Sequence, residues 1–270
     1  MSEPVIDDFL QAIGQRWTQR CIGPGSLAVE NSVLRLSIPL VQQTCYADAQ
    51  IDDYGSLARS AFPWRPPLRM EVRARSSLPA ATSDQSGAFL RGTAGFGFWN
   101  YPFSVRGDIL MSPEAIWFFY ASPPSNMALV PGLPGWGWKA QVVHSMRPGA
   151  LLAALPTALT TSWGMLTGHT QSAARWLQRL SGASEALLAI DMTQWHTYTL
   201  EWHVHEALFW VDGNMVLRAP RPPTRPLGFV AWLDNQYAIA TPRGQLRFGT
   251  VACSSEWLEI DTIYIADISK

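Results

Sequence analysis

The alternation of hydrophobic and polar residues is clearest between Gln194 and Leu217, where it predicts antiparallel strands. Tyr198, Leu200 and Trp202 share one face of an extended segment, and polar residues occupy the other face. A second segment, ALFWV, runs into Asp212-Gly213, a pair that tolerates the positive φ angles of tight turns. A β-hairpin is therefore expected here, and the chain leaves its turn through Asn214.

The same alternation recurs along most of the chain. The segment 68–75 (LRMEVRAR) is the strongest case, because every second residue is charged and the others are apolar. The other predicted strands outside the hairpin cover 32–39, 227–237 and 257–268. Two aromatic-dense segments without a clean polar face, 94–100 and 115–121, are expected to be central strands. Turn-separated strands without alternating helices predict an all-β fold, an antiparallel β-sandwich of the jelly-roll type, formed by residues 1–270 as one domain.

Residues 129–189 depart from this pattern and are predicted to form an apolar helical and loop insertion. Residues 148–174 contain no charged side chain, but prolines, glycines and threonines argue against a membrane-spanning helix. Ala173, Trp176, Leu177 and Leu180 recur at helical spacing and predict a short amphipathic helix that ends at Gly182. A lid over a ligand site is the favoured use of the insertion. A homodimer contact or a membrane surface through residues 148–182 are the alternatives.

Composition narrows the classes of partner. The formal net charge is −1, with Lys and Arg spread along the chain, which excludes a nucleic-acid partner. The N-terminal residues are acidic and lack the basic start and apolar run of a secretory signal, so a cytoplasmic location is expected. The three cysteines are far apart and are expected to be reduced thiols.

The chain contains 13 tryptophans, more than a core of this size requires. Indole rings can stack on sugar rings or on flat apolar molecules, and they can equally fill a sandwich core. The tryptophans predicted to line a ligand site are Trp99, Trp117, Trp136, Trp138 and Trp232.

Several motifs, and their order along the chain, resemble those of the concanavalin A-like lectin and glucanase superfamily. The resemblance is strongest to family 16 glycoside hydrolases of the laminarinase type. The residues that carry this resemblance are Ile6-Asp7-Asp8-Phe9, Trp17, SVLRL at 32–36, LRMEVRAR at 68–75, GFGFWN at 95–100, the hairpin closed by Val211-Asp212-Gly213, and IDTIY at 260–264. The resemblance covers most of the chain outside the insertion. It implies that 68–75 and 95–100 belong to a sugar-facing sheet.

The catalytic motif of that family, Glu-x-Asp-x-x-Glu, is not present in the matching segment. If Glu114 matches the first Glu, then Ile116 stands at the Asp position and Phe119 at the second Glu position. A retaining glycosidase needs two carboxyl groups about 5–5.5 Å apart. Hydrolysis by the family mechanism is therefore not expected, although Glu114 stays a candidate catalytic carboxyl.

Asp234 is the strongest catalytic candidate outside that motif. It follows the apolar segment GFVAWL, and burial beside Trp232 would raise its pKa and suit it to general acid or base chemistry. The alternative is a strand-end carboxylate that accepts hydrogen bonds from turn amides. The neighbouring Asn235 and Gln236 are predicted to contact the ligand with it.

Three further residues complete the candidate set. Asn100 and Lys139, the only Lys in a long apolar region, are predicted ligand contacts. The alternatives are a turn-forming Asn and a snorkelling Lys. By resemblance to the family, Asp261 stands where such sandwiches place a structural calcium ion. No other cofactor is expected.

Two functions follow from these residues. The first is non-covalent binding of a saccharide or a flat apolar small molecule on an aromatic concave face. The second is an isomerase, cyclase or hydrolase that acts on a hydrophobic substrate, with Asp234 as general acid or base under the apolar lid.

Overall fold

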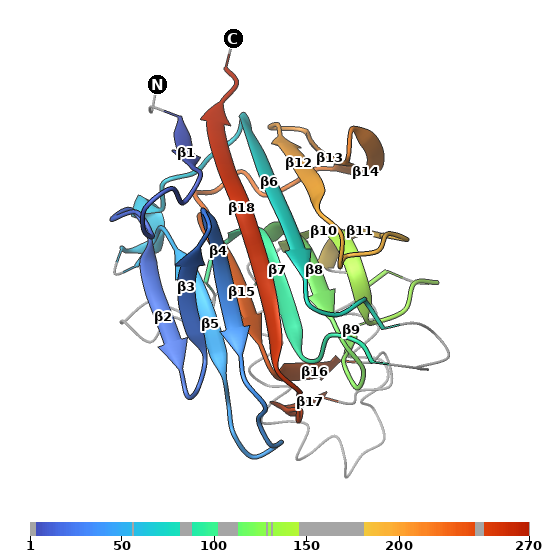
Figure 1. Ribbon diagram of the computed structural model, residues 1–270. Helices are drawn as coiled ribbons and strands as arrows, with labels where there is room; N and C mark the ends of the chain where they lie inside the picture. Colours follow the sequence, from blue (N-terminus) through green and yellow to red (C-terminus); the bar gives the residue numbers. More distant parts are fainter. Residues whose placement is uncertain are drawn as a thin grey trace.

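The computed structural model is a sandwich of two large β-sheets (Figure 1). It describes residues 4–55, 57–81, 88–101, 113–127, 129–130, 132–145, 181–240 and 246–269. Within these ranges the one helical element is the 3-10 turn η1 (Arg59–Ala61). No helix of the described residues is both long enough and apolar enough to cross a membrane.

The first large sheet has eight strands. It contains the predicted hairpin, the charged strand 68–75 and the C-terminal strand. Its order is β14 (Asn214–Pro220), β13 (Glu206–Val211), β12 (His196–Trp202), β6 (Leu68–Ser76), β18 (Glu256–Asp267), β4 (Val33–Ile38) and β3 (Ser26–Glu30), and β1 (Val5–Asp7) also pairs with β18.

The second large sheet has seven strands and is also antiparallel throughout. It contains the two aromatic segments and the apolar strand that leads to Asp234. Its order is β11 (Ser181–Leu187), β10 (Gly137–Ser145), β8 (Ala115–Ala121), β7 (Thr93–Trp99), β15 (Gly228–Asp234), β5 (Asp48–Asp52) and β2 (Thr18–Ile22).

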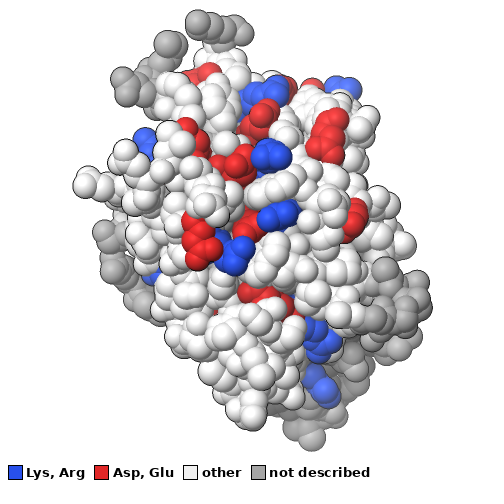
Figure 2. All heavy atoms as spheres, viewed as in Figure 1, with Lys and Arg blue, Asp and Glu red and all other residues white. Residues whose placement is uncertain are grey.

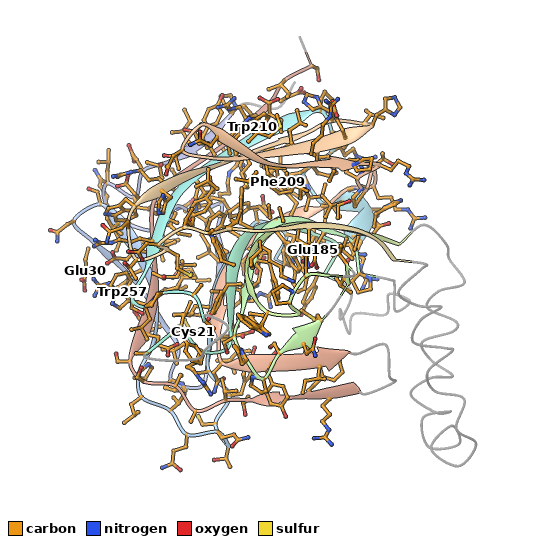
Figure 3. All side chains as sticks on the ribbon, turned by 90° about the vertical axis from the view of Figure 1, so that its right-hand side faces the viewer. Cys21, Glu30, Glu185, Phe209, Trp210 and Trp257 are labelled. Carbon is orange, nitrogen blue, oxygen red and sulfur yellow. The ribbon has the colours of Figure 1, made fainter. Side chains whose placement is uncertain are left out.

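A small third sheet continues from the end of β15. It consists of β17 (Leu246–Thr250), β16 (Gln236–Ala240) and β9 (Asn126–Met127). Met127 packs against aromatic residues on the outer face of the seven-stranded sheet. In Figure 3 the strands of this small sheet lie below the seven-stranded sheet, on the side away from the eight-stranded sheet.

The core lies between the two large sheets and follows from the alternation in the sequence. Tyr198, Leu200 and Trp202 of β12 are all buried and belong to the main apolar cluster, as predicted. Phe209 of β13 also lies between the sheets (Figure 3). Its ring centroid is 5.3 Å from that of Phe118 of β8, so rings from the two sheets meet in T-shaped contact.

The outer face of the eight-stranded sheet is charged and internally paired. Glu259 accepts hydrogen bonds from Arg35 and Arg75, and Arg73 pairs with Asp261 at 2.7 Å. Figure 2 shows acidic and basic side chains interspersed over this face. The charged residues of LRMEVRAR therefore form a solvated surface.

Three predictions are corrected by these strands. The described ends of the predicted helical insertion are strands β10 and β11, which pair from Lys139↔Leu187 to Ser145↔Ser181, whereas the predicted helix at 173–180 lies outside the described residues. The segment 68–75 is a strand as predicted, but it belongs to the sheet opposite the one that carries 95–100. The extended segment predicted before ALFWV is shorter than expected, because β12 ends at Trp202 and the chain turns before β13.

Candidate functional site

The site face is the face of the seven-stranded sheet that points away from the eight-stranded sheet. It carries five of the predicted site residues, Trp99, Trp117, Lys139, Trp232 and Asp234. Strand register places its side chains in rows, because residues paired across antiparallel strands point the same way. One row runs from Glu185 through Gln141, Trp117, Gly97 and Val230 to Asp52. The next row runs from Leu187 through Lys139, Phe119, Gly95 and Trp232 to Gln50.

An aromatic cluster covers the middle of the site face. Trp117 packs on Phe119 at a centroid distance of 5.3 Å and on Trp99 at 6.0 Å. Tyr101 continues the cluster, 5.3 Å from Trp99. Trp232 and Phe119 are buried, whereas Trp99, Tyr101 and Trp117 are partly exposed. The partly exposed rings are therefore the surface that a ligand can reach.

The three site-face indoles all have their N–H groups satisfied within the protein. Trp99 Nε1 donates to the Tyr54 hydroxyl at 2.8 Å, and Trp117 Nε1 donates to Gln141 Oε1 at 2.5 Å. Trp232 Nε1 donates to Thr93 Oγ1 at 2.9 Å. Because indole has no other polar group, these rings can offer a ligand their faces and edges but no free hydrogen-bond donor.

Asp234 lies at the end of β15 on the site face, as predicted. Its Oδ1 accepts hydrogen bonds from Thr93 Oγ1 at 2.8 Å, from the Thr93 amide at 3.3 Å and from the Gln236 amide at 3.0 Å. Burial raises its pKa to about 6, although these hydrogen bonds oppose the shift. Asp234 thus accepts main-chain amide hydrogen bonds, as a strand-end carboxylate does. Its pKa is also raised, as expected of a general acid or base.

Asp48, which was not predicted, lies directly opposite Asp234. The two residues pair in register on the adjacent strands β5 and β15, and both are at most 8% exposed. Burial, reinforced by the negative charge of Asp234, raises the pKa of Asp48 to about 8. The Asp48 carboxyl therefore keeps its proton near neutral pH.

Lys139, Trp136 and Trp138, all predicted ligand contacts, lie in three different environments. Lys139 is buried on the site face, where its Nζ donates to Glu185 Oε2 at 2.9 Å, so its ammonium group does not snorkel to solvent. Trp138 is buried on the opposite side of the same strand and packs 5.5 Å from Tyr198 in the main core, which excludes it from the ligand surface. Trp136 is half-buried and belongs to neither apolar cluster of the described residues.

The side chain of Asn235 is hydrogen-bonded to the main chain. It is fully buried, its Oδ1 accepts from the Ala47 amide at 2.9 Å, and its Nδ2 donates to the carbonyl oxygens of Cys45 and Val251 at 2.8 and 2.9 Å. All three partners are main-chain groups, so the amide joins separate segments and has little capacity left for a ligand. Gln236 is exposed and begins β16.

Glu114 lies on the core side of the seven-stranded sheet. It precedes Ile116 by two residues, and Ile116 is fully buried in the main core, whereas Trp117 and Phe119 belong to the cluster on the site face. If Glu114 is aligned with the first Glu of the catalytic motif, its side chain lies on the core side of β8 and not on the site face. Site-face positions of this strand are Ala115, Trp117, Phe119 and Ala121.

Glu114 has a distinct partner at the sheet end. Its Oε1 lies 3.6 Å from His144 Nδ1, and neither Glu114 Oε2 nor His144 Nδ1 has a hydrogen-bond partner among the described residues. Burial raises the pKa of Glu114 and lowers that of His144, and Arg225 lowers the latter further. Asn100 is buried beside this pair, where its Oδ1 accepts from the Glu114 amide at 3.1 Å.

Asp261 lies on the outer face of the eight-stranded sheet, in an ion pair with Arg73. Across the described ranges there is no group of three or more His, Cys, Asp or Glu side chains placed to hold a metal ion. A structural calcium ion at Asp261 stays a prediction from the family resemblance.

Sequence reasoning missed Asp48, Gln141 and Glu185. Asp48 and Glu185 belong to short strands, β5 and β11, that were not predicted, and each meets its partner only through pairing between distant segments. The DAQID alternation at Asp48–Asp52 was an available signal for β5. No local pattern could connect Glu185 with Lys139, which lies 46 residues earlier.

Comparisons with known proteins support the fold. No protein-family model matches the chain, and no curated protein sequence matches it significantly. Among solved structures, a Bacillus licheniformis beta-glucanase has a TM-score of 0.54 at 12% identity, with 98% of this chain and 99% of that chain covered. A glycoside hydrolase family 16 endo-glucanase from Bacteroides ovatus has a TM-score of 0.54 at 13% identity, covering 97% of this chain and 99% of the other.

A third solved structure, the endo-beta-1,3-glucanase from Pyrococcus furiosus, has a TM-score of 0.53 at 10% identity, covering 97% of this chain and 92% of the other. All three alignments extend over nearly the whole chain, so the likeness concerns the complete sandwich. At these identities it establishes architecture alone. The chain therefore has the concanavalin A-like jelly-roll fold of the family 16 glycoside hydrolases.

Proposed function

We propose that this protein binds a saccharide on the site face, by stacking on Trp99, Tyr101 and Trp117. The observation that supports this most directly is the continuous aromatic cluster whose partly exposed members lie at one surface. Sugar rings have apolar C–H faces that pack on indole, and aromatic rings contribute more than their buried area alone. The glucanase names of the similarly folded structures favour a saccharide over a flat apolar ligand.

The satisfied indole N–H groups refine this proposal. Each of the three indoles already donates to a protein oxygen, so ligand recognition would rely on ring faces. Recognition through faces suits the apolar side of a neutral sugar ring. Hydrogen bonds to sugar hydroxyls would come from other groups at the rim of the cluster.

The test uses the protein's own fluorescence. Cellohexaose and laminarihexaose are titrated into the wild-type protein, Trp117→Ala and a matched control, Trp195→Ala, whose indole lies against Arg73 and Arg75 on the eight-stranded sheet. A saturable response is expected in the wild type and the control. Affinity should fall at least tenfold in Trp117→Ala, about 1.4 kcal/mol of binding free energy. Equal affinity in all three proteins would exclude the cluster as the binding surface.

A second candidate function is an enzyme with general acid and base groups on the same face. The specific observation is the pairing of Asp48 with Asp234, whose environments raise their pKa values to about 8 and about 6. Asp48 would hold the proton and Asp234 would be the base, which suits an isomerase, cyclase or hydrolase. Loss of turnover in Asp48→Asn and Asp234→Asn, with ligand affinity retained, would favour this function over binding alone.

A further inference from the structure

Trp117 is the end of a chain of polar side chains that crosses three strands. Its Nε1 donates to Gln141 Oε1 at 2.5 Å, and Gln141 Nε2 donates to Glu185 Oε1 at 2.5 Å. The other oxygen of Glu185 accepts from Lys139 Nζ at 2.9 Å, and Lys139 also donates to the Pro134 carbonyl at 2.6 Å. The chain therefore runs from a partly exposed indole to a buried ion pair.

This chain is buried along its length. Gln141 and Lys139 are 2% exposed and Glu185 is 9% exposed. Trp117, Gln141 and Glu185 stand in one row across β8, β10 and β11, so the strand pairing itself places them in contact. Glu185 lies beside the strands of this sheet in Figure 3.

Stability alone is a poor explanation for such a chain. A buried ion pair loses the hydration of both charges, and apolar residues of similar volume usually stabilise a protein at least as well. A fully connected polar chain instead fixes geometry, because each side chain is oriented by the next one along it. The last donor of this polar chain is the Trp117 indole N–H, so the chain fixes the orientation of the Trp117 ring.

We infer that Gln141 and Glu185 are positioning residues that hold the Trp117 indole in its ligand-ready orientation. Gln141 contacts the ring directly, Glu185 orients the Gln141 amide, and Lys139 balances the charge of Glu185. The role in ligand binding rests on the proposed saccharide function, but the orientation of the ring does not. Ring orientation can therefore be tested without any ligand.

The first measurement is the indole N–H signal of Trp117 in the free protein, assigned by its loss in Trp117→Phe. In Gln141→Leu the acceptor is gone while the volume is nearly kept, so the signal should move upfield and its hydrogen exchange should become at least tenfold faster. The Trp232 signal should stay in place, because Thr93 accepts from it. An unchanged Trp117 signal in folded Gln141→Leu would overturn the inference.

Two further variants separate positioning from general destabilisation. Glu185→Gln keeps an oxygen that can accept from Gln141 Nε2, so the Trp117 signal should stay near its wild-type position. Thr199→Val alters a buried polar residue of the eight-stranded sheet and should leave the signal unchanged whatever it does to stability. If Gln141→Leu does not fold, Gln141→Met serves as the second variant with the same expected result.

The second measurement is the affinity for laminarihexaose. We expect Gln141→Leu to bind at least fivefold more weakly than wild type, and Glu185→Gln to retain most of the affinity. A shifted Trp117 signal with wild-type affinity would overturn the role in binding. Absence of binding by the wild-type protein would instead reject the proposed saccharide function, and the indole signal would still decide whether Gln141 positions the ring.

Discussion

The indole rings of Trp117 and Trp232 meet at a centroid distance of 5.2 Å, although β8 and β15 are separated by β7. The contact is possible because β7 places Gly95 and Gly97 between them on the site face. A Cβ atom on Gly95 would lie 2.9 Å from the Trp232 ring, and one on Gly97 would lie 2.6 Å from the Cα and Cβ atoms of Trp117. The same Cβ atoms would overlap the Phe118 carbonyl oxygen and lie 2.6 Å from the Ile116 carbonyl oxygen, so the two glycines are required both by the strand pairing and by the aromatic cluster.

Replacement of Gly97 by alanine is expected to displace Trp117 and to lower the free energy of unfolding by about 1–3 kcal/mol, the usual range for overpacking. Chemical denaturation measures this loss. Gly14→Ala is the control, because its Cβ would meet side-chain atoms and no backbone atom, the nearest being Asp7 Oδ2 at 3.1 Å. Similar stability losses in both variants would argue against the packing role of Gly97.

The Asp48 carboxyl is expected to make stability depend on pH. Its folded-state pKa of about 8 exceeds the ordinary value of 3.8, so the folded protein binds more protons than the unfolded chain between these values. The free energy of unfolding should therefore fall as pH rises from about 4 to about 8. Each unit of pKa shift corresponds to about 1.4 kcal/mol, and Asp234, whose pKa is raised to about 6, adds to the same slope.

Asp48→Asn cannot ionise and should flatten this slope, so that the variant gains stability relative to wild type at pH 8. Urea denaturation at several pH values from 4 to 8 tests the prediction. Asp261→Asn, on the eight-stranded sheet, should retain the wild-type slope. Parallel pH profiles for Asp48→Asn and wild type would show that the folded-state pKa of Asp48 is not raised.

The buried pair of Lys139 and Glu185 predicts a non-additive result. Glu185→Leu leaves the ammonium group of Lys139 buried without its charged partner and should cost about 3–5 kcal/mol of folding free energy. Lys139→Met combined with Glu185→Leu removes both charges and should recover most of that loss. A double-mutant cycle in guanidinium chloride measures the coupling, and additive losses would contradict a direct interaction.

Asn235 is expected to matter for folding and little for ligand contact. Asn235→Ala removes hydrogen bonds to three main-chain groups and should lower the free energy of unfolding by about 2–4 kcal/mol. The exposed neighbour Gln236 is the matched control, because Gln236→Ala should change stability by less than about 0.5 kcal/mol. A stable Asn235→Ala variant that loses saccharide binding would return Asn235 to the ligand surface.

Much of the fold could be predicted, from strict alternation at 68–75 and from aromatic density at 115–121. The segment 115–121 matches β8, and the hairpin at Asp212-Gly213 joins β13 and β14. Alternation determines which residues share a face, but it does not determine which face meets the core. Trp138 was therefore assigned to the ligand surface although it lies in the core, and Glu114 was matched in a register that points away from the site.

The candidate site was less predictable because its polar contacts join distant segments. Asp234 was identified from its apolar neighbours, whereas its partner Asp48 depends on the pairing of β15 with β5. Lys139 was recognised as unusual, but only the pairing of β10 with β11 brings Glu185 beside it. Residues 129–189 depart from the strand pattern and were predicted to be helical and loop, yet their described ends, β10 and β11, extend the seven-stranded sheet.

The seven-residue pairing of β10 with β11 has an evolutionary consequence. Its last pair, Ser145↔Ser181, holds the two ends of the intervening segment side by side, independently of what that segment contains. Doubling the length of a connection whose ends are already fixed costs only about 0.6 kcal/mol of chain entropy. Insertions and deletions between these two serines should therefore accumulate among relatives without disturbing the position of Gln141 or Glu185.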